Sequence, residues 1–72
     1  MKRLLYSELL ELGFGSKIRI VWNNSPHHDK NEEYHGVVFG KKIGWEDGLA
    51  DDLNTIAECM YNNWCIVYLI SE

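Results

Sequence analysis

Residues 64–70, WCIVYLI, decide the fold predicted for this chain, because an extended strand of this sequence is apolar on both faces. A strand with two apolar faces is normally covered on both sides or lies centrally in its sheet. At a sheet edge the same strand would be prone to aggregation. We therefore predict that it lies in the middle of a small antiparallel or mixed sheet, with a helix on one face.

Three segments upstream have the character of strands. Residues 17–22 (KIRIVW) alternate, with the two isoleucines and the tryptophan on one face and Lys17, Arg19 and Val21 on the other, which predicts a half-buried strand. Residues 34–40 (YHGVVFG) are rich in β-branched and aromatic side chains, and residues 42–45 (KIGW) predict a short strand after a turn. The predicted sheet therefore has three or four strands.

Two segments predict helices. Residues 6–16 (YSELLELGFGS) predict a short helix that Ser7 caps and Gly13 ends. Residues 47–63 predict the main helix. Its buried stripe consists of Leu49, Leu53, Ile56 and Met60. The expected fold class is α+β, with a short N-terminal helix and a longer helix before the last strand; an SH3-like barrel with a helical insertion also fits the pattern.

The composition predicts one compact domain over residues 1–72. Hydrophobic residues make up 46% of the chain, with three Trp and four Tyr, and such rings bury large areas in a small core. The chain has two cysteines, Cys59 and Cys65, whereas a secreted mini-protein of this size usually has more, in paired spacings. We therefore expect reduced thiols in a cytosol.

The N-terminal segment MKRLLYSELLEL begins like a signal peptide, but Ser7, Glu8 and Glu11 interrupt its apolar run. No segment approaches the ~20 consecutive apolar residues of a membrane-spanning helix. We therefore expect a soluble, cytoplasmic protein with no membrane partner.

The charge distribution favours a basic partner over nucleic acid. The formal net charge is −4, whereas non-specific nucleic-acid binders cluster Lys and Arg to replace counterions. Residues 46–58 contain no base and five acids, which are Glu46, Asp47, Asp51, Asp52 and Glu58. On the predicted helix Asp51, Thr55 and Glu58 share a face opposite the apolar stripe. This face is either a solvated helix surface or a docking surface for a basic protein.

The polar segment 23–33 is the second candidate site. It spans eleven residues, whereas hairpin loops usually take two to five, so it is either a partner-binding loop with His27 and His28 near its tip or a disordered spacer. Zinc could use these histidines with His35 and the cysteines, and a surface metal site could use His27, His28 and Asp29. The cysteines are not a close ligand pair, and we expect no metal and no cofactor.

Catalysis has weaker support, because nothing activates Ser25 beside His27 and no carboxylates stand out as an acid–base pair. We expect no enzyme activity. Trp45 is either a core residue or a partly exposed binding anchor. A homodimer through an exposed strand edge or Trp45 is the remaining alternative.

In its short length, acidity and lack of catalytic motifs, the chain resembles small orphan proteins of bacteriophages and mobile elements, including anti-CRISPR and other anti-defence inhibitors. The resemblance covers the whole chain in general character and none of it in motif, so it assigns no residue a role. It implies a protein-binding inhibitor of a host nucleic-acid-handling or defence protein. The acidic helix face and the long polar loop, inferred from the residues themselves, are the surfaces through which we expect it to act.

Overall fold

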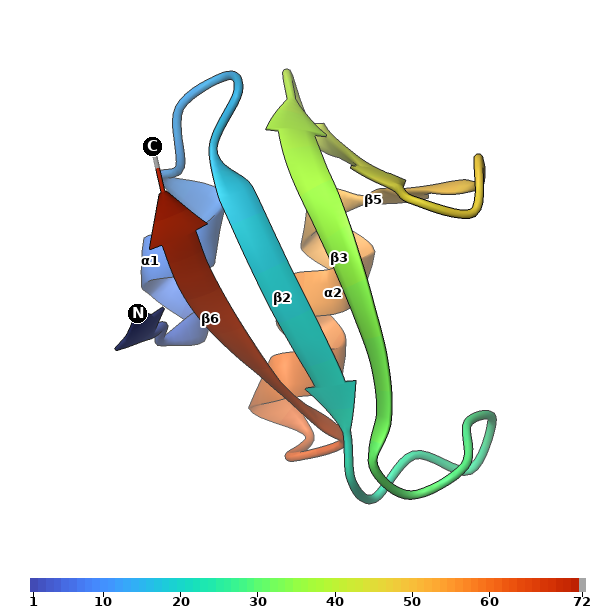
Figure 1. Cartoon of the computed structure of the whole chain (residues 1–72). Coiled ribbons are helices and arrows are strands. Elements are labelled where there is room, and N and C mark those ends of the chain that lie inside the picture. The colour runs from blue at the N-terminus through green and yellow to red at the C-terminus, as the bar shows by residue number, and fades with distance from the viewer. Residues whose placement is uncertain (72) are drawn as a thin grey trace.

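The computed structural model describes residues 1–71, which form six strands and two helices (Figure 1). In chain order the elements are β1 (Lys2–Arg3), α1 (Tyr6–Leu10), β2 (Lys17–Trp22), β3 (Glu32–Phe39), β4 (Lys42–Trp45), β5 (Ala50–Asp52), α2 (Leu53–Tyr61) and β6 (Cys65–Ser71). The strands form one antiparallel sheet in the order β1-β6-β2-β3-β4-β5. The α+β class is confirmed, but the sheet has more strands than predicted and is open rather than a closed barrel.

The C-terminal strand β6 has a neighbour on each edge, β1 and β2, but it lies second from one edge of the sheet rather than in its middle, and the two residues of β1 pair with Leu69 and Tyr68 alone. Both helices lie behind the sheet and leave its other face uncovered (Figure 1). Cys65 and Val67 are buried toward the helices, while Ile66 and Tyr68 on the opposite face are half-buried. The guanidinium of Arg19 lies 5.4 Å from the centre of the Tyr68 ring and covers part of this second face. A neighbouring side chain therefore supplies cover there in place of a helix.

The core lies between the inner face of the sheet and the two helices, which pack against each other. Its largest fully buried side chains are Leu9, Ile18, Ile20, Val38, Ile43, Ile56 and Val67. Burial of one such side chain contributes about 1.5–3 kcal/mol, so this cluster carries much of the stability of a small domain. No helix within residues 1–71 is long and apolar enough to cross a membrane.

The main helix is shorter than predicted. It begins at Leu53, because residues 50–52 pair with β4 as strand β5. Leu53 and Ile56 are buried as expected, but Leu49 is 67% exposed. Gly48, at φ +90°, reverses the chain before β5, and a backbone in that conformation cannot continue a helix. Sheet pairing and this turn therefore override the helical spacing of the apolar residues.

The first helix also begins differently from its prediction. Leu5 precedes its first residue, and Ser7 lies inside the helix rather than capping it. The side chain of Glu8 caps the helix N-terminus instead, because its Oε1 accepts a hydrogen bond from the Leu5 N–H at 2.9 Å. Lys2 Nζ lies 2.7 Å from Glu8 Oε2. The hydrogen bonds from Lys2 and Leu5 lower the pKa of Glu8 below its usual value.

Candidate functional site

The β2–β3 loop (residues 23–31) and the β4–β5 turn (residues 46–49) project beyond β3 on one side of the sheet (Figure 1). Side chains from both segments line a pocket there. Its volume is about 270 Å³. The residues that line it are Trp22, His28, Tyr34, Trp45, Asp47, Leu49, Ala50 and Asp51. We call it the aromatic–acidic pocket. Pockets for drug-sized ligands measure roughly 300–1,000 Å³, so this one suits a smaller group.

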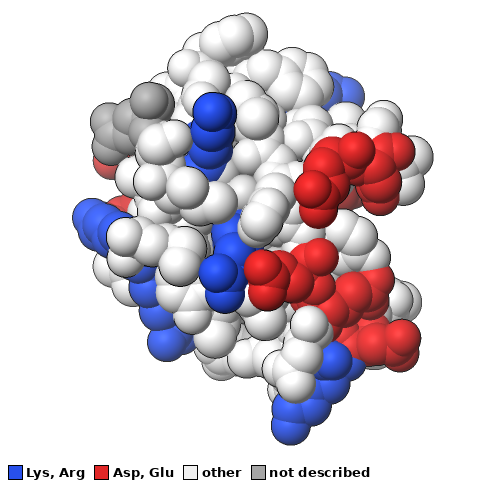
Figure 2. Space-filling model, in the orientation of Figure 1, with Lys and Arg blue, Asp and Glu red and all other residues white. Residues whose placement is uncertain are grey.

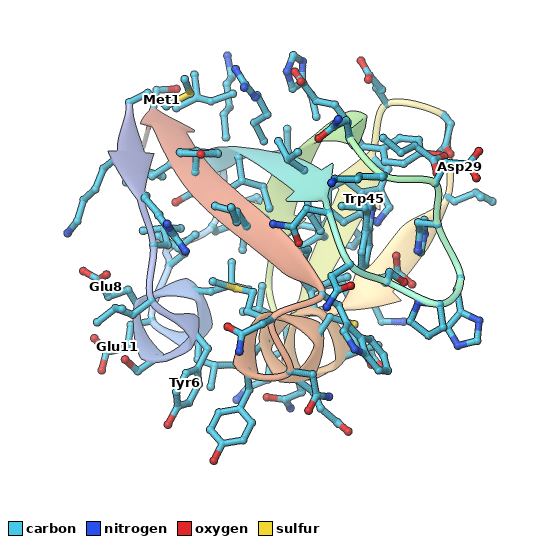
Figure 3. The ribbon with its side chains drawn as sticks, turned by 90° about the horizontal axis from the view of Figure 1, so that it is seen from below. Met1, Tyr6, Glu8, Glu11, Asp29 and Trp45 are labelled. Carbon is cyan, nitrogen blue, oxygen red and sulfur yellow. The ribbon has the colours of Figure 1, made fainter. Side chains whose placement is uncertain are left out.

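Its aromatic walls come from three neighbouring strands. Trp22 ends β2, Tyr34 lies near the start of β3, and Trp45 ends β4. The rings of Tyr34 and Trp45 are inclined at 57° with their centroids 6.5 Å apart. Figure 3 shows Trp45 on the same side of the molecule as Asp29 of the loop, away from Met1 at the N-terminus.

Gly36 makes room for the Trp45 ring. The two residues are paired across β3 and β4. A Cβ atom on Gly36 would lie 2.7 Å from Trp45 Cε3 and 2.7 Å from Ile43 Cγ2, well inside the normal contact distance. Any larger residue at this position would therefore displace the tryptophan that forms the pocket wall.

The β2–β3 loop folds against the end of β2 rather than forming a spacer. The His28 ring stacks on Trp22 with centroids 3.8 Å apart and planes 1° from parallel. Ser25 Oγ lies 3.3 Å from His28 Nδ1. The Asn31 N–H donates to the Trp22 carbonyl at 2.6 Å. These contacts fix His28 as part of the pocket wall.

Hydrogen bonds from the chain itself hold the carboxylates of the pocket in position. Asp51 Oδ2 accepts from the Trp45 indole N–H at 2.7 Å, and Asp47 Oδ1 accepts from the Leu49 N–H at 3.0 Å. Beside the pocket, Glu32 accepts hydrogen bonds from the Tyr34 hydroxyl and from the Asp29 N–H. The negative charges are therefore ordered around the aromatic rings.

The electrostatics of Tyr34 reflect this arrangement. Its hydrogen bond to Glu32 raises the pKa of its hydroxyl, and burial and the negative charges of Glu32, Asp47 and Asp29 raise it further. The pKa of Glu32 is lowered, chiefly by the same hydrogen bond and then by that from the Asp29 N–H. A group with positive charge would be favoured where these carboxylates meet.

Among the described residues, neither aspartate of the pocket forms an ion pair, and His28 is the one basic side chain in the pocket lining. Within residues 1–71, the carboxylates in ion pairs are Glu8, Glu33 and Asp52, and neither Asp47 nor Asp51 has a Lys, Arg or His nitrogen within 4.0 Å. Figure 2 shows acidic side chains gathered over the β4–β5 turn and over the lower part of β3, on one side of the face in view. This side of the molecule therefore carries a concentrated negative charge.

Half of the site residues predicted from the sequence meet in this pocket: His28, Trp45, Asp47 and Asp51. The others lie elsewhere. Asp52 Oδ1 is 3.8 Å from Lys42 Nζ, and Glu58 is exposed on α2. Glu46 accepts a hydrogen bond from the His35 N–H at 3.4 Å. The His27 and Trp64 rings are arranged edge to face, with their centroids 6.3 Å apart.

The predicted acidic helix face is wrong in its geometry. Asp51 and Asp52 belong to β5, where successive side chains point to opposite sides of the strand. Asp51 therefore turns to Trp45, and Asp52 turns away. Of the two acidic residues predicted for that face, Glu58 lies on α2 and Asp51 does not.

Sequence reasoning did not single out Trp22 and Tyr34 as site residues. The alternation of residues 17–22 already placed Trp22 on the buried face, at the strand end that meets the loop. What the sequence did not contain was the order of the strands, which brings Trp22, Tyr34 and Trp45 together.

The ligands considered for a metal do not converge. Within the described part of the chain, no three or more His, Cys, Asp or Glu side chains form a group that could hold a metal ion. Burial raises the pKa of the Cys65 thiol to about 12, with a smaller contribution from Cys59. Burial is also the main cause of the raised pKa of Cys59. Both thiols are therefore poor sources of the thiolate that zinc prefers.

Comparison with known proteins adds no relative. No protein-family model matches the chain, and neither a curated protein nor a solved structure matches it. The chemistry of the aromatic–acidic pocket is therefore the basis for assigning a function.

Proposed function

We propose that this chain is a small non-enzymatic protein-binding module that docks on a basic surface of a partner protein. The observation that supports this proposal is the pocket itself, where Asp47 and Asp51 form no ion pair within residues 1–71 and line the wall together with the half-buried ring of Trp45. Tryptophan and tyrosine are enriched among the residues that dominate binding energy at protein interfaces. Complementary charge around such an anchor speeds association and sets the orientation of the partner.

The role that fits this chemistry best is inhibition of a host nucleic-acid-handling or defence protein, in the manner of the phage-type inhibitors that the chain resembles. Proteins that bind nucleic acid carry clustered Lys and Arg, because these residues neutralise phosphates. An acidic module with a net charge of −4 can occupy such a surface and block it. The β2–β3 loop would supply further polar contacts from His27 and its neighbours.

Affinity capture with two matched double variants tests the proposal. Asp47→Lys with Asp51→Lys reverses the charge of the pocket, whereas Asp52→Lys with Glu58→Lys makes the same change in net charge away from it. We expect the first pair to lose the partner from a bacterial lysate and the second pair to retain it. The retained complex should also weaken as salt rises, because exposed charges are screened. A partner that binds both double variants equally well contradicts the proposal.

Self-association is a second candidate, supported by the uncovered face of the sheet. Val37, Phe39 and Ile70 there are 42%, 41% and 44% exposed. A second copy could cover this face, since exposed apolar patches often mark interfaces. Sedimentation of the chain at several concentrations decides the matter: a mass that rises with concentration supports a homodimer, and a monomer throughout excludes it.

A further inference from the structure

We propose that the aromatic–acidic pocket is a receptor for an alkylammonium group, the end of a lysine side chain on the partner protein, and that it favours the methylated form. The proposed function supplies the source of this group, so that part of the inference rests on it. The chemistry of the pocket does not depend on the identity of the partner.

The aromatic rings are spaced for a cation. Cation–π attraction requires the charge to lie within about 6 Å of a ring centroid, and tryptophan is the best acceptor. The centroids of Tyr34 and Trp45 are 6.5 Å apart and their planes are inclined at 57°, so a cation seated in the angle that the two rings form can lie within that distance of both. The Trp45 indole N–H donates to the Asp51 carboxylate at 2.7 Å, which holds the ring in place and increases its electron density.

The carboxylates leave fewer free oxygens than a primary ammonium has donors, because one oxygen of Asp47, one of Asp51 and both of Glu32 accept hydrogen bonds from the chain. A primary ammonium has three N–H donors that lose water on entry and need replacement partners. A methylated ammonium has fewer donors or none, and it keeps its charge. The pocket therefore favours the methylated ion.

The same hydrogen bonds disfavour arginine. A guanidinium recognises a carboxylate best through two parallel bonds to both oxygens. At Asp51 one oxygen is occupied by the Trp45 indole, and at Asp47 one oxygen is occupied by the Leu49 N–H. Neither aspartate therefore presents a free pair of oxygens.

The size and rim of the pocket fit a side chain. Its volume of about 270 Å³ admits a chain end rather than a drug-sized molecule. Leu49, which is 67% exposed, and Ala50 line it together with the aspartates. A lysine packs its methylene stem on such apolar surface while its charged end reaches the polar groups.

The first experiment compares two probes of nearly equal shape on the unaltered chain. Choline carries a quaternary ammonium, and 3,3-dimethylbutan-1-ol is its neutral counterpart. Binding is followed by the NMR signal of the Trp45 indole N–H. We expect choline to bind roughly tenfold more tightly than the alcohol, because only the cation gains from the rings and the carboxylates. Equal affinities, or no binding of choline, overturn the inference.

The second experiment uses a pair of adjacent variants. Asp51→Asn removes a charge that lines the pocket but leaves an oxygen to accept the indole hydrogen bond, while Asp52→Asn removes a charge that faces Lys42. We expect choline affinity to fall about tenfold in the first and to stay unchanged in the second. Equal losses in both variants contradict a specific pocket. The comparison of the two probes needs no variant, so a misfolded variant does not prevent a decision.

The third experiment separates the two sources of the cation. Peptides with trimethyllysine or lysine at one position are titrated beside free choline. We expect the trimethyllysine peptide to bind most tightly and the lysine peptide several-fold more weakly. Tighter binding of free choline than of the trimethyllysine peptide overturns the assignment to a protein side chain. If neither choline nor the trimethyllysine peptide binds while capture of the partner still depends on Asp47 and Asp51, the inference fails and the proposed function stands. If the peptide binds but capture does not depend on these charges, the inference stands and the proposed function fails.

Discussion

The inner face of the sheet has two differently built regions. Behind β6 and β2 the two helices close it, and side chains such as Leu9, Ile56 and Val67 are almost completely buried. Toward β4 and β5 the face ends in Tyr34 and Trp45, which are half-buried and surrounded by carboxylates. Aliphatic side chains need complete cover, whereas a ring with a polar edge can close a core and remain accessible. The first region therefore stabilises the fold, and the second leaves a surface for binding.

The largest effect is expected in the helix-covered region. Leu9→Ala removes a fully buried side chain of α1 and should lower the free energy of unfolding by about 2–5 kcal/mol. Leu10→Ala is the matched control, because Leu10 is adjacent and 42% exposed, and it should cost well under ~1 kcal/mol. Urea denaturation measures both. Similar losses in the two variants would show that α1 is not anchored through Leu9.

A smaller loss is expected where the two regions meet. Gly36→Ala places a Cβ against Ile43 and Trp45, and overpacking of this kind costs about 1–3 kcal/mol. The melting temperature should fall by roughly 4–8 °C for each kcal/mol in a domain of this size. Gly13→Ala is the control, since nothing lies within 4 Å of its added Cβ. The choline affinity of Gly36→Ala should fall as well, because the Trp45 ring moves. Unchanged stability and unchanged affinity together would contradict the role assigned to Gly36.

Within the pocket, Tyr34→Phe should remove the contribution that the Tyr34–Glu32 hydrogen bond makes to stability, and this contribution depends on pH. The lowered pKa of Glu32 means that its stabilisation is present above the usual value of 4.5 and is lost as pH falls through the lowered pKa. The raised pKa of Tyr34 means that its stabilisation is present below the usual 10.0 and is lost as pH rises through the raised pKa. The difference between the parent and Tyr34→Phe should therefore be largest between these limits. Thermal melts from acid to alkaline pH measure it, and a difference independent of pH argues against the Tyr34–Glu32 bond.

The smallest effect on stability is expected for the carboxylate with the largest expected effect on binding. Asp51→Asn should change the free energy of unfolding by no more than about 0.5 kcal/mol, since an exposed carboxylate is replaced by an amide that still accepts the indole bond. Asp52→Asn, which loses an exposed ion pair with Lys42, should cost about 0–1 kcal/mol. Urea titrations compare the two. A loss well above 1 kcal/mol for Asp51→Asn would make that residue structural and not a binding group.

Local patterns predicted several elements well. The alternation in residues 17–22 matches β2, and the two-sided apolarity of residues 64–70 matches a strand with neighbours on both edges. Residues 50–52 were misassigned, because their helical spacing continues into α2 while their pairing partner, β4, is a separate segment. Helix spacing is visible within a single stretch of sequence, but strand pairing depends on residues outside it.

The sequence by itself determined the α+β class, the excess of acidic residues and the aromatic content of this protein, because these follow from composition and from periodicity within short segments. Only the tertiary structure decided the pocket. It requires the strand order that places Trp22, Tyr34 and Trp45 side by side, and the strand geometry that separates Asp51 from Asp52. The physical reason is that a strand turns successive residues to opposite sides and takes its hydrogen-bond partners from distant parts of the chain.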